Sequence, residues 1–244
     1  MKRVDSDFAR SCKRRAAAYA FGCVLGAASG FTCGADSGHG GSAPSGEVRC
    51  DSRSVTVRSP DSTGARIACD GARDALRFLE AQGFAVDGEV RIDLMPQVPP
   101  AAGNHALGCY LEPERRVLVL AFPEFAKLGT WMNLPADAAL YRSLVSHEVA
   151  HAVGDCNFKV AAPSIQAKEY IAYVTMLATM APALRERLLS QFPGEGFAGD
   201  WQMSTTIYLL DPLRFGAQAY RHFLKPANGR DYLHAILAGK VMIE

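Results

Sequence analysis

The sequence predicts an α+β fold, with a small sheet in the N-terminal half and only helices in the C-terminal half. Between residues 48 and 121, short β-rich runs with alternating apolar side chains accompany one amphipathic helix. From residue 135 onward, the regular segments all have helical spacing. Because no internal repeat or second-domain signal interrupts residues 48–244, we predict that this span forms one domain.

Four strands and one helix are expected in the N-terminal half, and five helices in the C-terminal half. The strands cover residues 54–58, 90–94, 106–111 and 116–121, and the last two form a hairpin around Glu112-Pro113-Glu114. The helices cover residues 65–82, a segment beginning near Pro135, a segment between Pro163 and Pro182 with Ser164 as its N-cap, and residues 182–191, 204–224 and 232–237.

The C-terminal half is organised around a short motif, His147-Glu148-Val149-Ala150-His151. Positions i and i+4 of a helix lie one above the other, so His147 and His151 can point at a single ion. Imidazole nitrogen is a good zinc ligand, and Glu148 is placed beside the ion rather than on it. A carboxylate there can take a proton from a metal-activated water, which is the general-base role in metal-assisted hydrolysis.

The neighbours of this motif are apolar, which predicts a largely buried helix. Buried polar groups are costly unless they are paired or bound to a metal. The alternative is a surface helix that happens to carry two histidines, but a surface helix would be less apolar. The apolar neighbours are Leu144, Val145, Val149, Ala150, Ala152 and Val153.

The motif resembles that of the HExxH zinc metallopeptidases, in which two patterns supply different third ligands. In the metzincin pattern, a third histidine would fall at position 157, where this chain has Asn157, a poor zinc ligand. In the gluzincin pattern, a glutamate on the next helix completes the site, and Glu169 lies eighteen positions after His151 (169 minus 151). The resemblance therefore implies Zn²⁺ held by His147, His151 and Glu169.

Glu169 belongs to a predicted helix that is otherwise mostly apolar, and an acidic residue there suggests a purpose. The alternative is an exposed first-turn glutamate favoured by the helix dipole, with Lys168 beside it pointing to solvent.

The resemblance covers roughly residues 105–180, and it also implies how the elements are arranged. The HExxH helix would pack beneath the sheet, with a cleft between the sheet lobe and the all-helical C-terminal lobe of a zincin-like fold. The strand at residues 116–121 would form the sheet edge beside the cleft, where an extended peptide pairs with the main chain in this family. The same apolar alternation also suits a core strand.

The function that the resemblance implies is zinc-dependent hydrolysis of peptide bonds, with Glu148 as general base and a peptide or protein as substrate. A further donor should stabilise the oxyanion, and the candidates are Tyr173, Tyr141 and His222. Tyr173 follows Glu169 by one helical turn and faces the same way, where many gluzincins have an acidic residue instead. Instead of acting as donors, Tyr173 could be an ordinary core residue and His222 a structural or surface residue.

Two other classes of function stay open at this point. One is a catalytically silent, exported zinc-binding module that uses the same site for structure or partner binding. The other is a protein in which the motif is accidental and the helices merely pack. The 26 basic and 25 acidic residues give a net charge of +1, so nothing argues for binding nucleic acid or an anionic surface. We expect a monomer.

Residues 1–35 have the pattern of a secretion signal, which predicts an exported protein, periplasmic or secreted. A basic stretch ending in Arg14-Arg15 precedes an apolar run rich in small residues. Features of twin-arginine and lipoprotein signals are weak. An uncleaved membrane anchor is the alternative, because the apolar run is only just long enough to span a bilayer. Residues 36–47 are rich in Gly and Ser and should form a flexible linker.

Of the 7 cysteines, three lie in the predicted signal and four lie beyond it. An even number in an exported domain implies two disulfides, with three connectivities open, and local organisation favours Cys50–Cys69 and Cys109–Cys156. A zinc site of these thiols is the alternative, but they lack the close paired spacing of structural zinc motifs.

Overall fold

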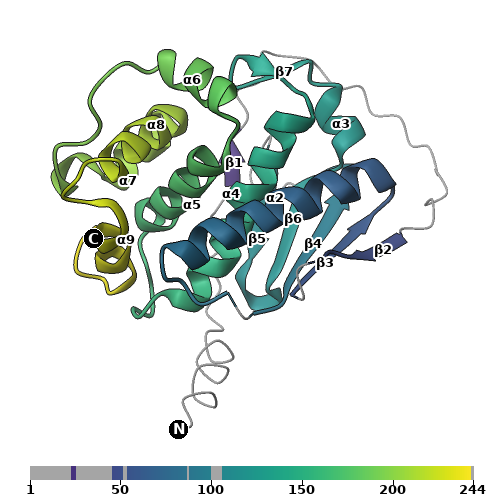
Figure 1. Cartoon of the computed structure of the whole chain (residues 1–244), viewed down its shortest axis with the longest axis horizontal. Helices are drawn as coiled ribbons and strands as arrows, with labels where there is room; N and C mark the ends of the chain where they lie inside the picture. The colour runs from purple at the N-terminus through teal and green to yellow at the C-terminus, as the bar shows by residue number, and fades with distance from the viewer. Residues whose placement is uncertain (1–22, 26–45, 52–53, 87, 100–105, 243–244) are drawn as a thin grey trace, which may run out of the picture.

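The structure, a computed structural model, describes residues 23–25, 46–51, 54–86, 88–99 and 106–242 (Figure 1). The predicted signal (residues 1–35) and linker (residues 36–47) lie outside the described residues, apart from strand β1 and the start of β2. The strands are β1 (Cys23–Leu25), β2 (Gly46–Arg49), β3 (Val55–Ser59), β4 (Val90–Met95), β5 (Ala106–Leu111), β6 (Arg116–Leu120), β7 (Thr130–Trp131) and β8 (Leu134–Pro135). The helices are α2 (Ser62–Ala81), α3 (Phe122–Ala126), α4 (Ala138–Asn157), α5 (Ile165–Thr179), α6 (Pro182–Ser190), α7 (Thr205–Leu210), α8 (Pro212–Phe223) and α9 (Gly229–Leu237), with short 3-10 helices η3 (Glu112–Glu114) and η4 (Asp200–Gln202).

The main sheet has the strand order β1-β5-β6-β4-β3-β2. Strands β3, β4 and β6 are parallel, with Val57 opposite Ile92 and Ile92 opposite Val117. Strand β5 runs antiparallel to β6, and β1 pairs with the other side of β5. The prediction that residues 116–121 form the sheet edge is wrong, because β6 is paired on both sides. Its nearly continuous apolar run is typical of an interior parallel strand.

Helices α2 and α4 pack against each other and against the sheet, which confirms the predicted place of the HExxH helix (Figure 1). The two helices approach closely at Gly71, where a Cβ would lie 2.5 Å from the carbonyl oxygen of Arg142. The Ser146 hydroxyl donates a hydrogen bond to the Gly71 carbonyl oxygen at 2.8 Å. A side chain at position 71 would therefore force α2 away from the helix that carries the motif.

Helix α4 is enclosed on nearly all sides, and fifteen of its 20 residues are buried. Asp137 caps its start, because the carboxylate accepts a hydrogen bond from the backbone N–H of Leu140 at 2.9 Å. A helix that is apolar all round belongs in the core of a protein. The polar side chains of the motif are therefore held inside the molecule.

The C-terminal part is helical, as the sequence predicts, but the expected helix at residues 204–224 is two helices. The chain breaks at Asp211, whose non-helical backbone (φ −153°, ψ 83°) separates α7 from α8. Pro212 lacks the N–H that a continuous helix requires, and it disfavours helical geometry at the residue before it. Asp211 instead caps α8 by accepting a hydrogen bond from the Arg214 N–H at 3.0 Å.

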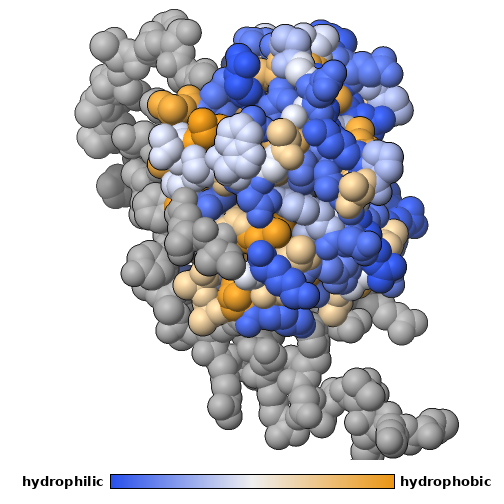
Figure 2. All heavy atoms as spheres, turned by 90° about the vertical axis from the view of Figure 1, so that its left-hand side faces the viewer, coloured by the Kyte–Doolittle hydropathy of each residue, from blue (hydrophilic) through white to orange (hydrophobic). Residues whose placement is uncertain are grey.

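Figure 2 turns the helical C-terminal part toward the viewer, and apolar residues lie there in separate patches among hydrophilic ones. The exposed large apolar side chains of this part include Trp201, Leu209 and Leu210. Single exposed apolar residues are normal on protein surfaces. Among the described residues, no helix has the length and apolar character needed to cross a membrane.

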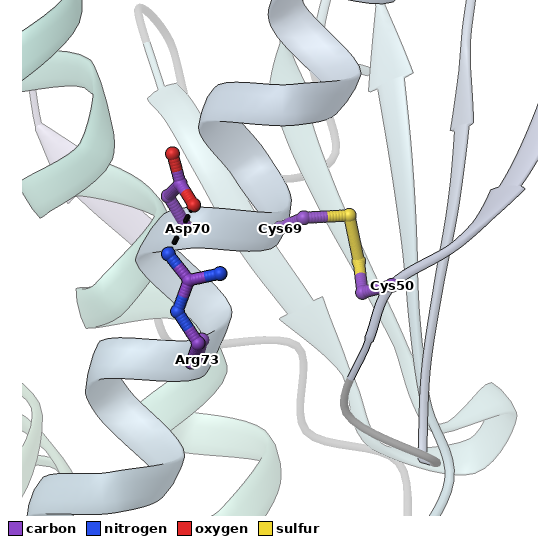
Figure 3. The surroundings of a disulfide bond; sticks show 4 residues. All are labelled: Cys50, Cys69, Asp70 and Arg73. Carbon is purple, nitrogen blue, oxygen red and sulfur yellow. Dashed lines mark hydrogen bonds and ion pairs between the residues drawn. A yellow bond between two sulfur atoms is a disulfide. The ribbon is translucent and has the colours of Figure 1, made fainter.

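A disulfide joins Cys50, directly after β2, to Cys69 on α2 (Figure 3). This pairing confirms one of the two predicted disulfides, and a disulfide points to an oxidising, extracytoplasmic environment. The predicted Cys109–Cys156 disulfide is wrong, since neither cysteine forms a disulfide. Cys109 is buried in a small apolar cluster with Val98, Ala106 and Leu118, apart from the main core. The Cys156 sulfur instead accepts a hydrogen bond from Arg115 Nη2 at 3.1 Å.

Removing this disulfide is expected to lower the free energy of unfolding by about 3 kcal/mol, because it closes a loop with a sequence separation of 19. The measurement is denaturant unfolding of the wild type against the Cys50→Ala/Cys69→Ala double variant. Wild type treated with reductant serves as the matched control and should show the same loss. Equal midpoints for oxidised wild type and double variant would contradict the expectation.

Candidate metal centre

Two histidines of α4 and one glutamate of α5 converge inside the molecule. His147 Nε2 lies 3.1 Å from His151 Nε2 and 3.5 Å from Glu169 Oε2. His151 Nε2 lies 3.6 Å from Glu169 Oε1, and the potential ligand atoms of the three residues all lie within 4.8 Å of one another. We call these three residues the His-His-Glu cluster. It is a group that could hold a metal ion.

The spacing of the His-His-Glu cluster matches the dimensions of a zinc site. Ligands about 2.0–2.1 Å from zinc at the corners of a tetrahedron lie roughly 3.3 Å from one another. The three separations of 3.1, 3.5 and 3.6 Å lie close to that edge length. Three protein ligands also leave one corner of the tetrahedron open, as catalytic zinc sites do.

Burial sets the protonation of the cluster in a way that suits a cation. Burial lowers the pKa of His147 and of His151 to about 3, so both imidazoles are neutral near pH 7 and can offer a lone pair. Burial raises the pKa of the Glu169 carboxyl, while His151 and the Tyr208 hydroxyl act in the opposite direction. A buried carboxyl between two neutral imidazoles is costly by itself, and a bound cation would offset that cost.

The burial of Glu169 and the ion pair of Lys168 exclude the alternative of an exposed first-turn glutamate with Lys168 pointing to solvent. Glu169 is fully buried. The Lys168 ammonium forms an ion pair with the Glu112 carboxylate at the end of β5, and both side chains are largely buried. This ion pair lines a narrow pocket between β5 and α5 that borders on His151.

Glu148 is fully buried and lies directly against strand β5. A Cβ at Gly108 would lie 2.7 Å from both Cγ and Oε1 of Glu148, so only glycine leaves room for this carboxylate. Gly108 was not among the residues predicted from the sequence to belong to the site. A glycine inside a predicted strand was the available signal, because such a glycine often marks a close approach.

Tyr173 also lies at the cluster, with its ring centroid 4.7 Å from that of His147. Burial raises the pKa of the Tyr173 hydroxyl well above its usual range, and the nearby carboxylates of Glu169 and Glu148 act in the same direction. Within the described part of the chain, this hydroxyl has no hydrogen-bond partner. Gly216 on α8 makes room for the ring, because a Cβ there would overlap it.

The structure places the other candidate residues away from the cluster. The Tyr141 hydroxyl donates to the Leu120 carbonyl oxygen at 2.7 Å, and His222 Nδ1 lies 2.8 Å from the Tyr170 hydroxyl. Asn157, at the metzincin third-ligand position, uses its amide to bind the backbone of Ala85 at 2.8 and 2.9 Å. These hydrogen bonds all join the side chains to groups outside the His-His-Glu cluster.

Tyr208 is a second residue near the site that was not predicted from the sequence. It lies on α7 and is buried, and its hydroxyl acts to lower the pKa of the Glu169 carboxyl. Tyr208 follows Glu169 by 39 positions (208 minus 169), and no motif links the two. Nothing in the local sequence signals this approach.

The fold and the cluster together define an α+β protein with a buried His-His-Glu group on an HExxH helix and its neighbour, a group consistent with a zinc site. The chain belongs to DUF6639, a family of unknown function, whose model matches residues 55–244. That span contains the whole cluster together with Glu148, Tyr173 and Tyr208. No curated protein and no solved structure matches the chain.

Proposed function

We propose that the protein is a zinc-dependent peptidase in which the His-His-Glu cluster holds the ion and Glu148 is the general base. The observation that carries this proposal is the convergence of three buried ligand atoms at zinc spacing, with a buried carboxylate next to them on the same helix. Two imidazoles and one carboxylate are also a ligand set of catalytic zinc sites. When bound, zinc supplies Lewis acidity and lowers the pKa of water.

Glu148 handles the proton in this proposal. Its carboxylate accepts a proton from the attacking water, holds it on an oxygen, and passes it to the leaving amine. Strand β5 confines the carboxylate at Gly108, so it is oriented before substrate arrives. Preorganisation of this kind lowers the barrier, because little reordering is needed during the reaction.

Tyr173 is the proposed donor to the oxyanion. Its ring contacts His147, and its hydroxyl is not engaged by another described residue, so it is available to a developing negative charge. We propose that a peptide or protein substrate reaches the site between β5 and α5. The pocket that borders on His151 is lined by Tyr110 of β5, by Glu112 of η3 and by Lys168 of α5.

The proposal is tested by metal content and hydrolysis measured on one purified sample of the protein. Elemental analysis should find one zinc per chain, and a mixed peptide library should be cleaved by a sample that chelator inactivates and added zinc restores. Zinc without cleavage of any peptide would favour the metal-binding module that lacks catalysis. Absence of bound metal at saturating zinc would remove the peptidase proposal.

The Gly108→Ala variant is expected to lose about 100-fold in kcat while keeping its zinc, because misplacing a reacting group by about 1 Å costs roughly that much. The added Cβ would meet Glu148 and displace its carboxylate, whereas the His-His-Glu cluster is not touched. The matched control is Gly46→Ala, another strand glycine, where a Cβ meets no atom within 4 Å. Unchanged kcat in a folded, zinc-loaded Gly108→Ala protein would show that Glu148 is not the base.

A further inference from the structure

A largely buried ion pair lies in the pocket that borders on the His-His-Glu cluster. His151 is 6% exposed, whereas His147 and Glu169 are 0% exposed, and His151 is the member of the cluster that lines the pocket. The pocket therefore marks a way from the surface to the cluster. Lys168 of α5 and Glu112 of η3 pair there, and their side chains are 16% and 18% exposed.

The pocket is too narrow in this structure to admit a substrate side chain. Its volume is about 10 Å³, enough for one water molecule. A substrate that enters between β5 and α5 must therefore widen the pocket. The ion pair of Lys168 with Glu112 joins the two sides that have to separate, because η3 directly follows β5.

Opening this ion pair is costly unless the Lys168 ammonium finds a new partner. A buried charge that loses its partner is left uncompensated. Glu112 lies on the short turn between β5 and β6, where a released carboxylate can be rehydrated. An incoming carboxylate can replace Glu112 on Lys168, whereas a neutral group leaves the ammonium unpaired. A site of this kind selects its ligand by penalising the wrong one.

We propose that Lys168 is a specificity-determining residue, which binds a carboxylate of the substrate in the place that Glu112 occupies in this structure. The inference rests on the proposed function for the reaction, and it names the substrate class as peptides with a carboxylate close to the cleaved bond. An acidic side chain and a free C-terminus offer the same charge and the same acceptor oxygens. The ammonium group has three donors to offer to either of them.

The test compares kcat/KM for matched peptides that differ in one carboxylate. A peptide that the protein cleaves is made with Asp or Asn at each position beside the cleaved bond, and with a free or an amidated C-terminus. Wild-type protein should prefer the carboxylate form by about 10–100-fold, the range that hydrogen bonds to charged groups contribute. The first pair of peptides reports an acidic side chain, and the second reports the C-terminus.

Replacing Lys168 with methionine keeps a long side chain and removes the charge. We expect Lys168→Met to cleave both forms of the peptide with similar kcat/KM. The matched control is Lys127→Met, because Lys127 pairs with Glu124 at 2.7 Å on α3, is 69% exposed and does not line the pocket. This control should keep the wild-type preference. Glu112→Gln removes the competing carboxylate, so it should raise kcat/KM for the carboxylate peptide more than for the neutral one.

A variant with the two charges exchanged guards against a folding defect. Lys168→Glu/Glu112→Lys allows an ion pair of reversed direction, and a melting temperature near that of the wild type would show that the fold is intact. We expect this variant to lose the preference for the carboxylate peptide. An ion pair with a purely structural role would leave the preference unchanged, since the contact is restored.

The outcomes separate this inference from the proposed function. Cleavage by wild-type protein without any preference for a carboxylate would overturn the role of Lys168 and leave the peptidase proposal standing, as would a preference that persists in Lys168→Met. A preference for basic peptides that is lost in Glu112→Gln would assign recognition to Glu112 and also overturn it. If wild-type protein cleaves no peptide, the proposed function fails, and the Kd values of the same peptides then decide. A Kd preference that is lost in Lys168→Met would support the inference, and equal Kd values would overturn it.

Discussion

Replacing Glu148 with glutamine is expected to abolish peptide hydrolysis and to leave the bound zinc in place. Glutamine has nearly the shape of glutamate, so it should fit against β5 at Gly108 as the carboxylate does. An amide cannot accept the proton that a general base must take, and general-base catalysis typically contributes about 10²–10⁴-fold. The measurement is kcat on a cleaved library peptide, with zinc content determined on the same samples.

The matched control for this experiment is Glu186→Gln, since Glu186 is an exposed carboxylate on α6, far along the chain from the motif. It should change neither rate nor metal content. Hydrolysis at the wild-type rate in Glu148→Gln would assign the base to another residue. Loss of zinc along with activity would place Glu148 among the metal ligands and contradict the separation of roles.

Replacing Glu169 with alanine is expected to remove the zinc dependence of thermal stability. A ligand that binds only the folded state adds about 2.7 kcal/mol when its free concentration is 100 times its Kd. Without Glu169, the ion would keep only His147 and His151 from the cluster, and we expect affinity to fall by more than about 100-fold, the upper end of what partners of metal ligands contribute. The measurement is the melting temperature with and without zinc.

Wild-type protein should melt at a higher temperature in zinc, and Glu169→Ala should melt at the same temperature in both conditions. Glu186→Ala, which removes an exposed glutamate, should retain the zinc-dependent rise of the wild type. A rise of wild-type size in Glu169→Ala would mean that a different carboxylate, such as Asp155 at the end of α4, supplies the third ligand. Asp155 accepts a hydrogen bond from the Tyr110 hydroxyl at 3.2 Å.

Local patterns were sufficient to predict the fold class and most of the elements. Alternation of apolar side chains located β3 to β6, and cap residues located the start of α5, where the Ser164 hydroxyl accepts from the Ala167 N–H. The spacing of His147 and His151 placed both imidazoles on one helical face, since that geometry depends only on the helix. Pro212 was also a local signal for a helix break, and the prediction of one helix over residues 204–224 did not take it into account.

Contacts between distant segments were decided only by the tertiary structure. The order of strands in a sheet depends on how helices cross over between them, so the sequence did not reveal that β6 is interior. Disulfide pairing depends on which cysteines lie close together in space, and Cys109 and Cys156 do not form a disulfide. The close approach of Gly108 to Glu148 joins elements far apart in the chain. The sequence by itself determined which side chains could bind a metal, whereas only packing decided what orients them.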